Sequence, residues 1–176
     1  INPSLNVSGN GNVPFCNGNT FNISTNVSGG LPPYSYFWSG PGIIPGQEPT
    51  TQNISNTVGG TYQVTVVDNA GCASQPVSTD AIPNSTPIPN AGLDQTISCT
   101  SNSSSSGAPI GMIPVAGINY SWLPITNLSN AAIANPNAAP GGTQTYTLTA
   151  VDPSNGCSST DEVLVIVNQI VPVANA

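Results

Sequence analysis

The side chains that could carry acid–base, nucleophilic or metal chemistry in this sequence are seven carboxylates and four cysteines. The 176 residues contain no lysine, arginine or histidine, and the net charge is −7. Histidine catalysis, a lysine Schiff base and an arginine clamp are therefore excluded. The adjacent carboxylates, Asp161 and Glu162, point to opposite faces of a strand, so they cannot flank a sugar as glycoside hydrolysis requires. The sequence predicts a protein that is not an enzyme and has no catalytic residues.

Two aspartates begin turns, Asp68 in Asp-Asn-Ala-Gly and Asp152 in Asp-Pro-Ser-Asn-Gly. Aspartate at the start of a turn ordinarily caps backbone N–H groups. The alternative is a calcium site to which Asp94, Asp161 or Glu162 adds oxygen ligands. Because the sequence has neither an EF-hand nor an aspartate-rich repeat, we expect no cofactor and no metal, and calcium remains the alternative.

The cysteines are spaced alike in the two halves of the chain, at Cys16 and Cys72 and again at Cys99 and Cys157. Four cysteines allow three pairings, and the repeat favours Cys16–Cys72 and Cys99–Cys157. Cys99 follows an expected first strand, Cys157 opens an expected last strand, and such strands commonly lie side by side in sandwiches. Single cysteines this far apart, without histidine, lack metal-ligand spacing. We therefore expect one disulfide in each half and an oxidising, extracellular compartment.

An internal repeat of about 85 residues organises the chain. The sequence of Gly60–Asp68 is similar to that of Thr143–Asp152, and Ile88-Pro-Asn-Ala-Gly92 is similar to Val173-Ala-Asn-Ala176. We predict one domain at 1–86, a second at 87–170, and a linker or the start of a further repeat at 171–176. The expectation is a mature or internal piece of a longer tandem array.

The sequence of each repeat predicts six or seven short strands. Residues 34–38, 62–66, 118–122 and 145–150 alternate with period two, and glycine and proline clusters separate them. Residues 162–167 form the most apolar segment. Helix-favouring residues are scarce. The fold class predicted is all-β, with two tandem immunoglobulin-like β-sandwich domains joined by the proline-rich segment 84–89.

Aromatic residues recur at matching offsets. Trp38 and Trp122, with Tyr62 and Tyr146, are expected in the two cores. Phe37 must face opposite Trp38 in a regular strand. Phe37 and Tyr34 are therefore the expected exposed aromatics and the possible ligand surface, as a platform on which a sugar could stack.

Eight Asn-X-Ser/Thr sequons are possible glycosylation sites. They begin at Asn6, Asn22, Asn26, Asn53, Asn84, Asn102, Asn119 and Asn127.

The composition also limits the partners. A chain without cations cannot neutralise phosphates, which excludes nucleic acid, and it has no basic attraction to anionic lipids. No apolar run approaches the ~20 residues that span a bilayer, so we expect no membrane insertion. The expected partners are neighbouring repeats or like subunits, with a surface polysaccharide as a further candidate.

The first repeat resembles the SprB-type repeat of Bacteroidetes gliding-motility adhesins. The matching residues are Cys16–Gly18, Gly29–Trp38 and Gly60–Cys72. The second resembles the PKD-like or Ig-like repeats of the same secreted proteins, through Asn90–Cys99, Tyr120–Trp122, Leu128–Asn130 and Thr143–Cys157. The resemblance implies a PKD-like β-sandwich, export to the cell surface by the type IX system, and a spacer or adhesive stalk for gliding, without catalytic residues.

The function expected is that of a non-enzymatic extracellular structural or adhesion protein, as a fragment of a tandem-repeat surface adhesin or of a self-assembling filament. The alternative is a carbohydrate-binding or spacer module of a secreted polysaccharide-degrading enzyme.

Overall fold

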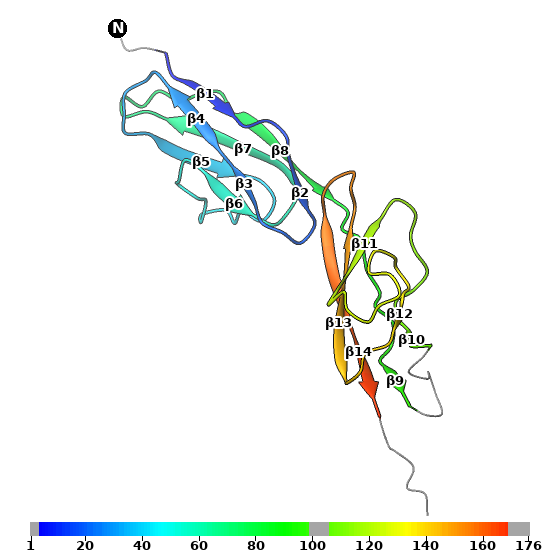
Figure 1. The fold of residues 1–176 in the computed structure, drawn as a ribbon. Coiled ribbons are helices and arrows are strands. Elements are labelled where there is room, and N and C mark those ends of the chain that lie inside the picture. The colour runs from blue at the N-terminus through cyan, green and yellow to red at the C-terminus, as the bar shows by residue number, and fades with distance from the viewer. Residues whose placement is uncertain (1–3, 99–105, 169–176) are drawn as a thin grey trace, which may run out of the picture. The chain divides into compact units, whose positions relative to one another are not determined.

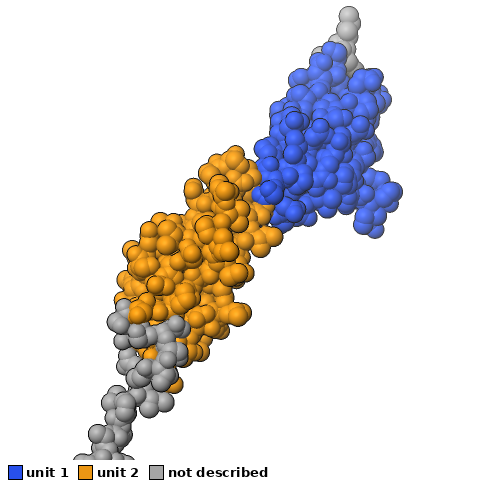
Figure 2. All heavy atoms as spheres, turned by 90° about the vertical axis from the view of Figure 1, so that its right-hand side faces the viewer, with its two compact units in different colours: residues 1–85 blue, residues 86–176 orange. Residues whose placement is uncertain are grey.

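Fourteen strands and no helix make up the described residues, 4–98 and 106–168, of the computed structural model (Figure 1). The chain divides into two compact units, residues 1–85 and 86–176 (Figure 2), where the sequence suggested a boundary after residue 86. The strands of unit 1 are β1 (Asn6–Gly9), β2 (Val13–Cys16), β3 (Phe21–Ile23), β4 (Thr25–Ser28), β5 (Ser35–Ser39), β6 (Ile54–Asn56), β7 (Gly60–Val67) and β8 (Val77–Asn84). Those of unit 2 are β9 (Gln95–Ile97), β10 (Ala108–Pro109), β11 (Asn119–Leu123), β12 (Asn137–Ala138), β13 (Gln144–Val151) and β14 (Ser158–Val167).

The main sheet of unit 1 has the order β2-β8-β7-β5. Its strands alternate between buried and exposed residues, as a sheet with one solvated face requires. Along β7, Tyr62, Val64 and Val66 point into the core, and on β5 Tyr36 and Trp38 do so. The period-two pattern in the sequence therefore marks the buried face correctly.

A second layer made of two short pairs, β1-β4 and β3-β6, covers this core. Phe21 and Ile23 of β3 and Ile54 of β6 supply its buried side chains. The ring of Phe21 lies 4.5 Å from that of Phe15 and 5.7 Å from that of Tyr62, measured between centroids. These contacts join the second layer to the main sheet.

Unit 2 repeats the plan with the order β11-β13-β14-β9, and a short pair, β10-β12, supplies part of its other layer. Its core contains Trp122, Tyr146, Leu148, Val163 and Val165. In both units the strand that carries tryptophan pairs antiparallel with the strand that carries the buried tyrosine.

The first and last strands of each main sheet are neighbours, and they run parallel. In unit 1, β2 pairs with β8 from Val13↔Ala81 to Cys16↔Asn84. In unit 2, β9 pairs with β14 from Gln95↔Val165 to Ile97↔Val167. The predicted proximity of first and last strands is thus confirmed, and their direction decides where the cysteines lie.

Candidate functional site

The two tryptophans lie inside the cores. Trp38 is 2% exposed and Trp122 is 1% exposed. Each indole N–H donates a 2.9 Å hydrogen bond to a backbone carbonyl oxygen, that of Thr51 for Trp38 and that of Ile133 for Trp122. The indoles therefore tie the long loop after β5, or after β11, to the core, and they offer no surface to a sugar.

Tyr62 and Tyr146 are also buried, and their hydroxyl groups are satisfied by loop carbonyls. The Tyr62 O–H contacts the carbonyl oxygens of Pro41 and Val58, and the Tyr146 O–H donates to that of Thr126 at 3.2 Å. Burial raises the pKa of both phenols above the ordinary value of 10.0. Both tyrosines thus act as structural anchors.

Phe37 and Tyr34, the expected exposed aromatics, differ in the structure. Phe37 is 54% exposed on the outer face of the main sheet of unit 1, opposite Thr65. Tyr34 is half-buried against the core, and its hydroxyl donates to the Gly29 carbonyl oxygen at 2.7 Å. The candidate surface therefore consists of Phe37 among the hydroxyl and amide groups of Ser35, Ser39 and Gln63.

The predicted disulfide between Cys16 and Cys72 is wrong. Cys72 is a free, exposed thiol, whereas Cys16 is disulfide-bonded. Cys16 ends β2 opposite Asn84, the last residue of β8, while Cys72 lies in the turn that precedes β8. The length of β8 separates them by about 23 Å, far beyond the ~6 Å between the Cα atoms of a disulfide.

The predicted disulfide of unit 2 joins Cys99 and Cys157. Cys157 is buried and disulfide-bonded, and Cys99, its expected partner, lies outside the described residues.

The exposed thiol leads to a labelling prediction. Treating the native, unreduced protein with iodoacetamide is expected to alkylate Cys72, because the exposed Cys72 is free, while Cys16 and Cys157 are in disulfides. Mass spectrometry of chymotryptic peptides measures the adducts, since the chain has no trypsin sites. A Cys72→Ser variant is the control. An unlabelled Cys72 in the native protein would contradict the assignment.

Asp68 closes the turn between β7 and β8. Its side chain is buried and accepts hydrogen bonds from the backbone N–H groups of Cys72 (2.9 Å), Ala70 (3.0 Å) and Leu31 (3.1 Å). These N–H groups, with that of Cys72 foremost, lower the pKa of Asp68 below its ordinary 3.8. Asp68 thus caps backbone N–H groups.

Asp152 occupies the matching turn between β13 and β14. It accepts hydrogen bonds from the hydroxyl (2.6 Å) and backbone N–H (2.9 Å) of Ser154 and from the Asn155 side chain (2.9 Å). These bonds, led by that of the Ser154 hydroxyl, lower its pKa.

The two turns predict how stability depends on pH. The folded-state pKa values of Asp68 and Asp152 are depressed. The two carboxylates therefore contribute fully to the free energy of unfolding above about pH 4, and this contribution is lost as the pH falls through the folded-state pKa values. Thermal unfolding followed from about pH 6 to about pH 3 measures this loss. The Asp68→Asn/Asp152→Asn double variant should lose less stability over that range, and an undiminished loss would contradict the account.

The other five carboxylates also accept local hydrogen bonds. Their donors are Gly46 N–H for Glu48, the Thr61 hydroxyl for Asp80, Leu164 N–H for Asp94, Ala91 N–H for Asp161 and the Thr147 hydroxyl for Glu162. Within residues 4–98 and 106–168, no three Asp, Glu, Cys or His side chains gather as a metal would require.

Seven of the eight sequons fall in the part of the chain that the structure describes. Asn102 lies outside it, and Asn84 is half-buried at the end of β8. The other six asparagines are exposed, at positions 6, 22, 26, 53, 119 and 127.

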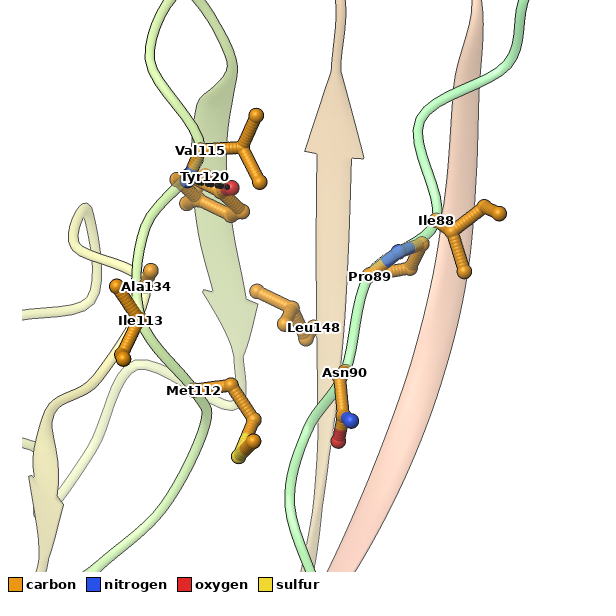
Figure 3. A pocket seen from close by; sticks show the side chains of 9 residues that line it. All are labelled: Ile88, Pro89, Asn90, Met112, Ile113, Val115, Tyr120, Ala134 and Leu148. Carbon is orange, nitrogen blue, oxygen red and sulfur yellow. Dashed lines mark hydrogen bonds between the residues drawn. The ribbon is translucent and has the colours of Figure 1, made fainter.

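A small pocket of about 50 Å³ in unit 2 was not foreseen from the sequence (Figure 3). The segment Ile88–Asn90 faces Met112, Ile113 and Val115 across it, with Leu148 and Tyr120 on neighbouring strands. The Tyr120 hydroxyl accepts a hydrogen bond from Val115 N–H at 2.9 Å.

Comparison with known proteins places the fold. No family model matches the sequence, and no curated protein does. Among solved structures, a SusE-like surface-located polysaccharide-binding protein from the Bacteroides thetaiotaomicron heparin utilisation locus matches 95% of this chain and 34% of its own, with 12% identity and a TM-score of 0.51. The fold is immunoglobulin-like, and both units are β-sandwiches of this class.

Two further structures are similar to this chain at lower scores. The eight N-terminal Ig domains of Down syndrome cell adhesion molecule match 94% of this chain and 24% of theirs, with 11% identity and a TM-score of 0.47. The fibronectin(III)-like modules of Clostridium thermocellum CbhA match 97% and 99%, with 16% identity and a TM-score of 0.35. The chain spans about a third and a quarter of the first two proteins.

Proposed function

We propose that this chain is a segment of a non-enzymatic extracellular protein in which tandem Ig-like units carry tension, as in the SprB-type surface adhesins that it resembles. The location proposed is the cell surface, reached through the type IX system, and the partners proposed are neighbouring repeats or like subunits. The observation that carries the proposal is the parallel pairing of the first and last strands of the main sheet in both units.

Parallel terminal strands resist a pull on the chain ends. When the ends are drawn apart, β2 and β8 are displaced in opposite directions along their shared line of evenly spaced hydrogen bonds. These bonds are then strained together, whereas an antiparallel hairpin pulled from its open end loses them one at a time. The same holds for β9 and β14 in unit 2.

The polar side chains suit a structural role. All seven carboxylates accept hydrogen bonds that fix turns, strand ends or cross-strand pairs.

In the described parts of the chain, no helix is long and apolar enough to cross a membrane.

Imaging of the native chain tests the proposal. We expect a mass well above the 17.7 kDa of this segment and, by negative-stain electron microscopy, a thin fibre of small repeated units. A chain that carries one bulky catalytic domain would contradict the proposal and make these units accessories to an enzyme.

The second candidate is carbohydrate binding, and the exposure of Phe37 favours it. An aromatic ring beside neutral Ser, Thr and Gln side chains offers both a stacking face and hydrogen-bond partners to a sugar. On this reading the chain is a binding or spacer module of a secreted polysaccharide-degrading enzyme, or it attaches a surface fibre to polysaccharide.

A Phe37→Ala variant tests this candidate on a glycan array. Loss of the ring is expected to weaken binding about tenfold or more, equivalent to at least 1.4 kcal/mol. Leu123→Ala is the matched control, because Leu123 is 65% exposed on the corresponding strand of unit 2. Equal binding by Phe37→Ala and the native chain, or no binding by either, would rule out a sugar site at Phe37.

A further inference from the structure

The second layer of unit 1 brings sequons together in pairs. Asn6-Val-Ser8 on β1 lies antiparallel to Asn26-Val-Ser28 on β4, so that Asn6 faces Ser28 and Ser8 faces Asn26. Asn22-Ile-Ser24 and Asn53-Ile-Ser55 meet likewise along β3 and β6, where Asn22 faces Ser55. Four sequons therefore share the outer face of one layer, which carries no charged side chain on these strands.

Strand geometry explains the shared face. In a strand, residues i and i+2 point to the same side, so the asparagine and serine of each sequon project outward together. The residue between them points inward, as Ile23 and Ile54 do in the core of unit 1.

Most of the exposed sequons already use their polar groups in the fold. The Asn6 amide donates to the Ser4 carbonyl oxygen at 3.2 Å, and the Asn53 side-chain oxygen accepts from Thr25 N–H at 3.1 Å. The Ser55 hydroxyl donates to the Asn22 side chain, and the Ser129 hydroxyl of the Asn127 sequon accepts from Asn137 N–H. These groups are committed to local structure.

In two sequons neither the asparagine side chain nor the serine hydroxyl is used in a hydrogen bond of the described structure. Asn26 with Ser28, and Asn119 with Ser121, are exposed, and within the described residues their side chains make no hydrogen bond. Both sequons lie on edge strands, since β4 pairs with β1 alone and β11 is the first strand of its sheet. An enzyme can therefore approach them from the side of the sheet.

The protein itself covers both edges only in part: the Thr25 N–H of β4 donates to the Asn53 side chain, and the Trp122 N–H of β11 donates to the Ala131 carbonyl oxygen. An exposed edge strand invites pairing with another chain, and proteins usually blunt it with lysine or proline. Neither β4, with the sequence Thr-Asn-Val-Ser, nor β11, with Asn-Tyr-Ser-Trp-Leu, has a charge or a proline. In contrast β5, the edge that carries Phe37, has no sequon.

We propose that Asn26 and Asn119 are N-glycosylated and that the glycans shield these two edges. The inference rests on the export included in the proposed function. In the transfer, the Asn side-chain nitrogen forms a bond to the anomeric carbon of a lipid-pyrophosphate-linked sugar. The bond from that carbon to the pyrophosphate oxygen breaks, the amide loses a proton, and the lipid pyrophosphate leaves. A glycan at Asn26 also crowds Asn6, which is diagonal to it at about 7–8 Å.

Mass spectrometry of the native protein tests the assignment. The masses of chymotryptic peptides and of their fragments should place sugar on Asn26 and Asn119, with Asn22, Asn53 and Asn127 bare. In the native host, Ser28→Ala should abolish the glycan on Asn26, whereas Ser28→Thr should keep it. The Ser28 side chain is exposed and its hydroxyl makes no hydrogen bond in the described structure, so neither change should disturb the fold.

Three results would overturn the proposal: bare Asn26 and Asn119 in the native protein, sugar on the hydrogen-bonded asparagines instead, or a modification of Asn26 that survives Ser28→Ala. Each is independent of the fibre that the proposed function predicts in electron micrographs, so glycosylation can fail while the proposed function stands. Circular dichroism of both Ser28 variants checks that the fold is kept.

Discussion

Replacing Trp122 by alanine is expected to lower the free energy of unfolding of unit 2 by about 3–5 kcal/mol. The indole is 1% exposed in the core of unit 2. The substitution removes this packing, and it leaves the Ile133 carbonyl without the indole N–H, 2.9 Å away, that binds it. Unit 1 should keep its stability because it has a core of its own.

The fluorescence of the remaining tryptophan separates the two units. In Trp122→Ala, Trp38 is the single tryptophan and reports on unit 1 alone, while far-ultraviolet circular dichroism follows both units during urea unfolding. Trp122→Phe is the control that keeps a ring in the site and loses mainly the hydrogen bond. A large shift in the Trp38 transition would contradict the independence of the units.

Replacing Gly111 by alanine is expected to cost unit 2 about 2–5 kcal/mol. Gly111 has a φ of +78°, in the left-handed region, and an added Cβ would lie 1.9 Å from the Ala134 carbonyl oxygen and 3.1 Å from Cζ2 of Trp122. The backbone of the loop between β11 and β12, which contains Ala134, or the indole itself would have to move.

Gly117→Ala is the matched control for backbone strain. Gly117 has a φ of +82°, and an added Cβ would meet no atom within 4 Å. It should therefore cost only the left-handed strain of about 1–2 kcal/mol. Chemical unfolding of both variants measures the difference. Equal losses for Gly111→Ala and Gly117→Ala would show that the close approach at Gly111 has no energetic consequence.

The fold could be predicted from the sequence because its signals are local. The alternation around Trp38 and Tyr62 marks strands and their buried faces, and the repeat transfers both to Trp122 and Tyr146. Strand direction is a long-range property set by connections that no local pattern records. The first and last strands were expected side by side, but their parallel course, which keeps Cys16 from Cys72, was not.

The sequence could not show which candidate site residues face one another, because that depends on the register between paired strands. Each sequon could be found by its motif, yet the facing of Asn6 with Ser28 and of Asn22 with Ser55 depends on pairing between distant segments. In the same way, Tyr34 and Phe37 looked equivalent as exposed aromatics. In the structure the Tyr34 ring packs against the core and its hydroxyl donates to the Gly29 carbonyl, whereas Phe37 stays exposed.

Single-molecule stretching of this segment by its two ends tests the mechanical role most directly. Under reducing conditions, so that no disulfide shortens the released length, we predict two force peaks, one per unit, each releasing about 25 nm of chain. Both peaks should stand well above the force needed to peel a hairpin apart, because β2–β8 and β9–β14 are loaded along their length. Extension without distinct peaks, or a single peak for the whole segment, would contradict the account.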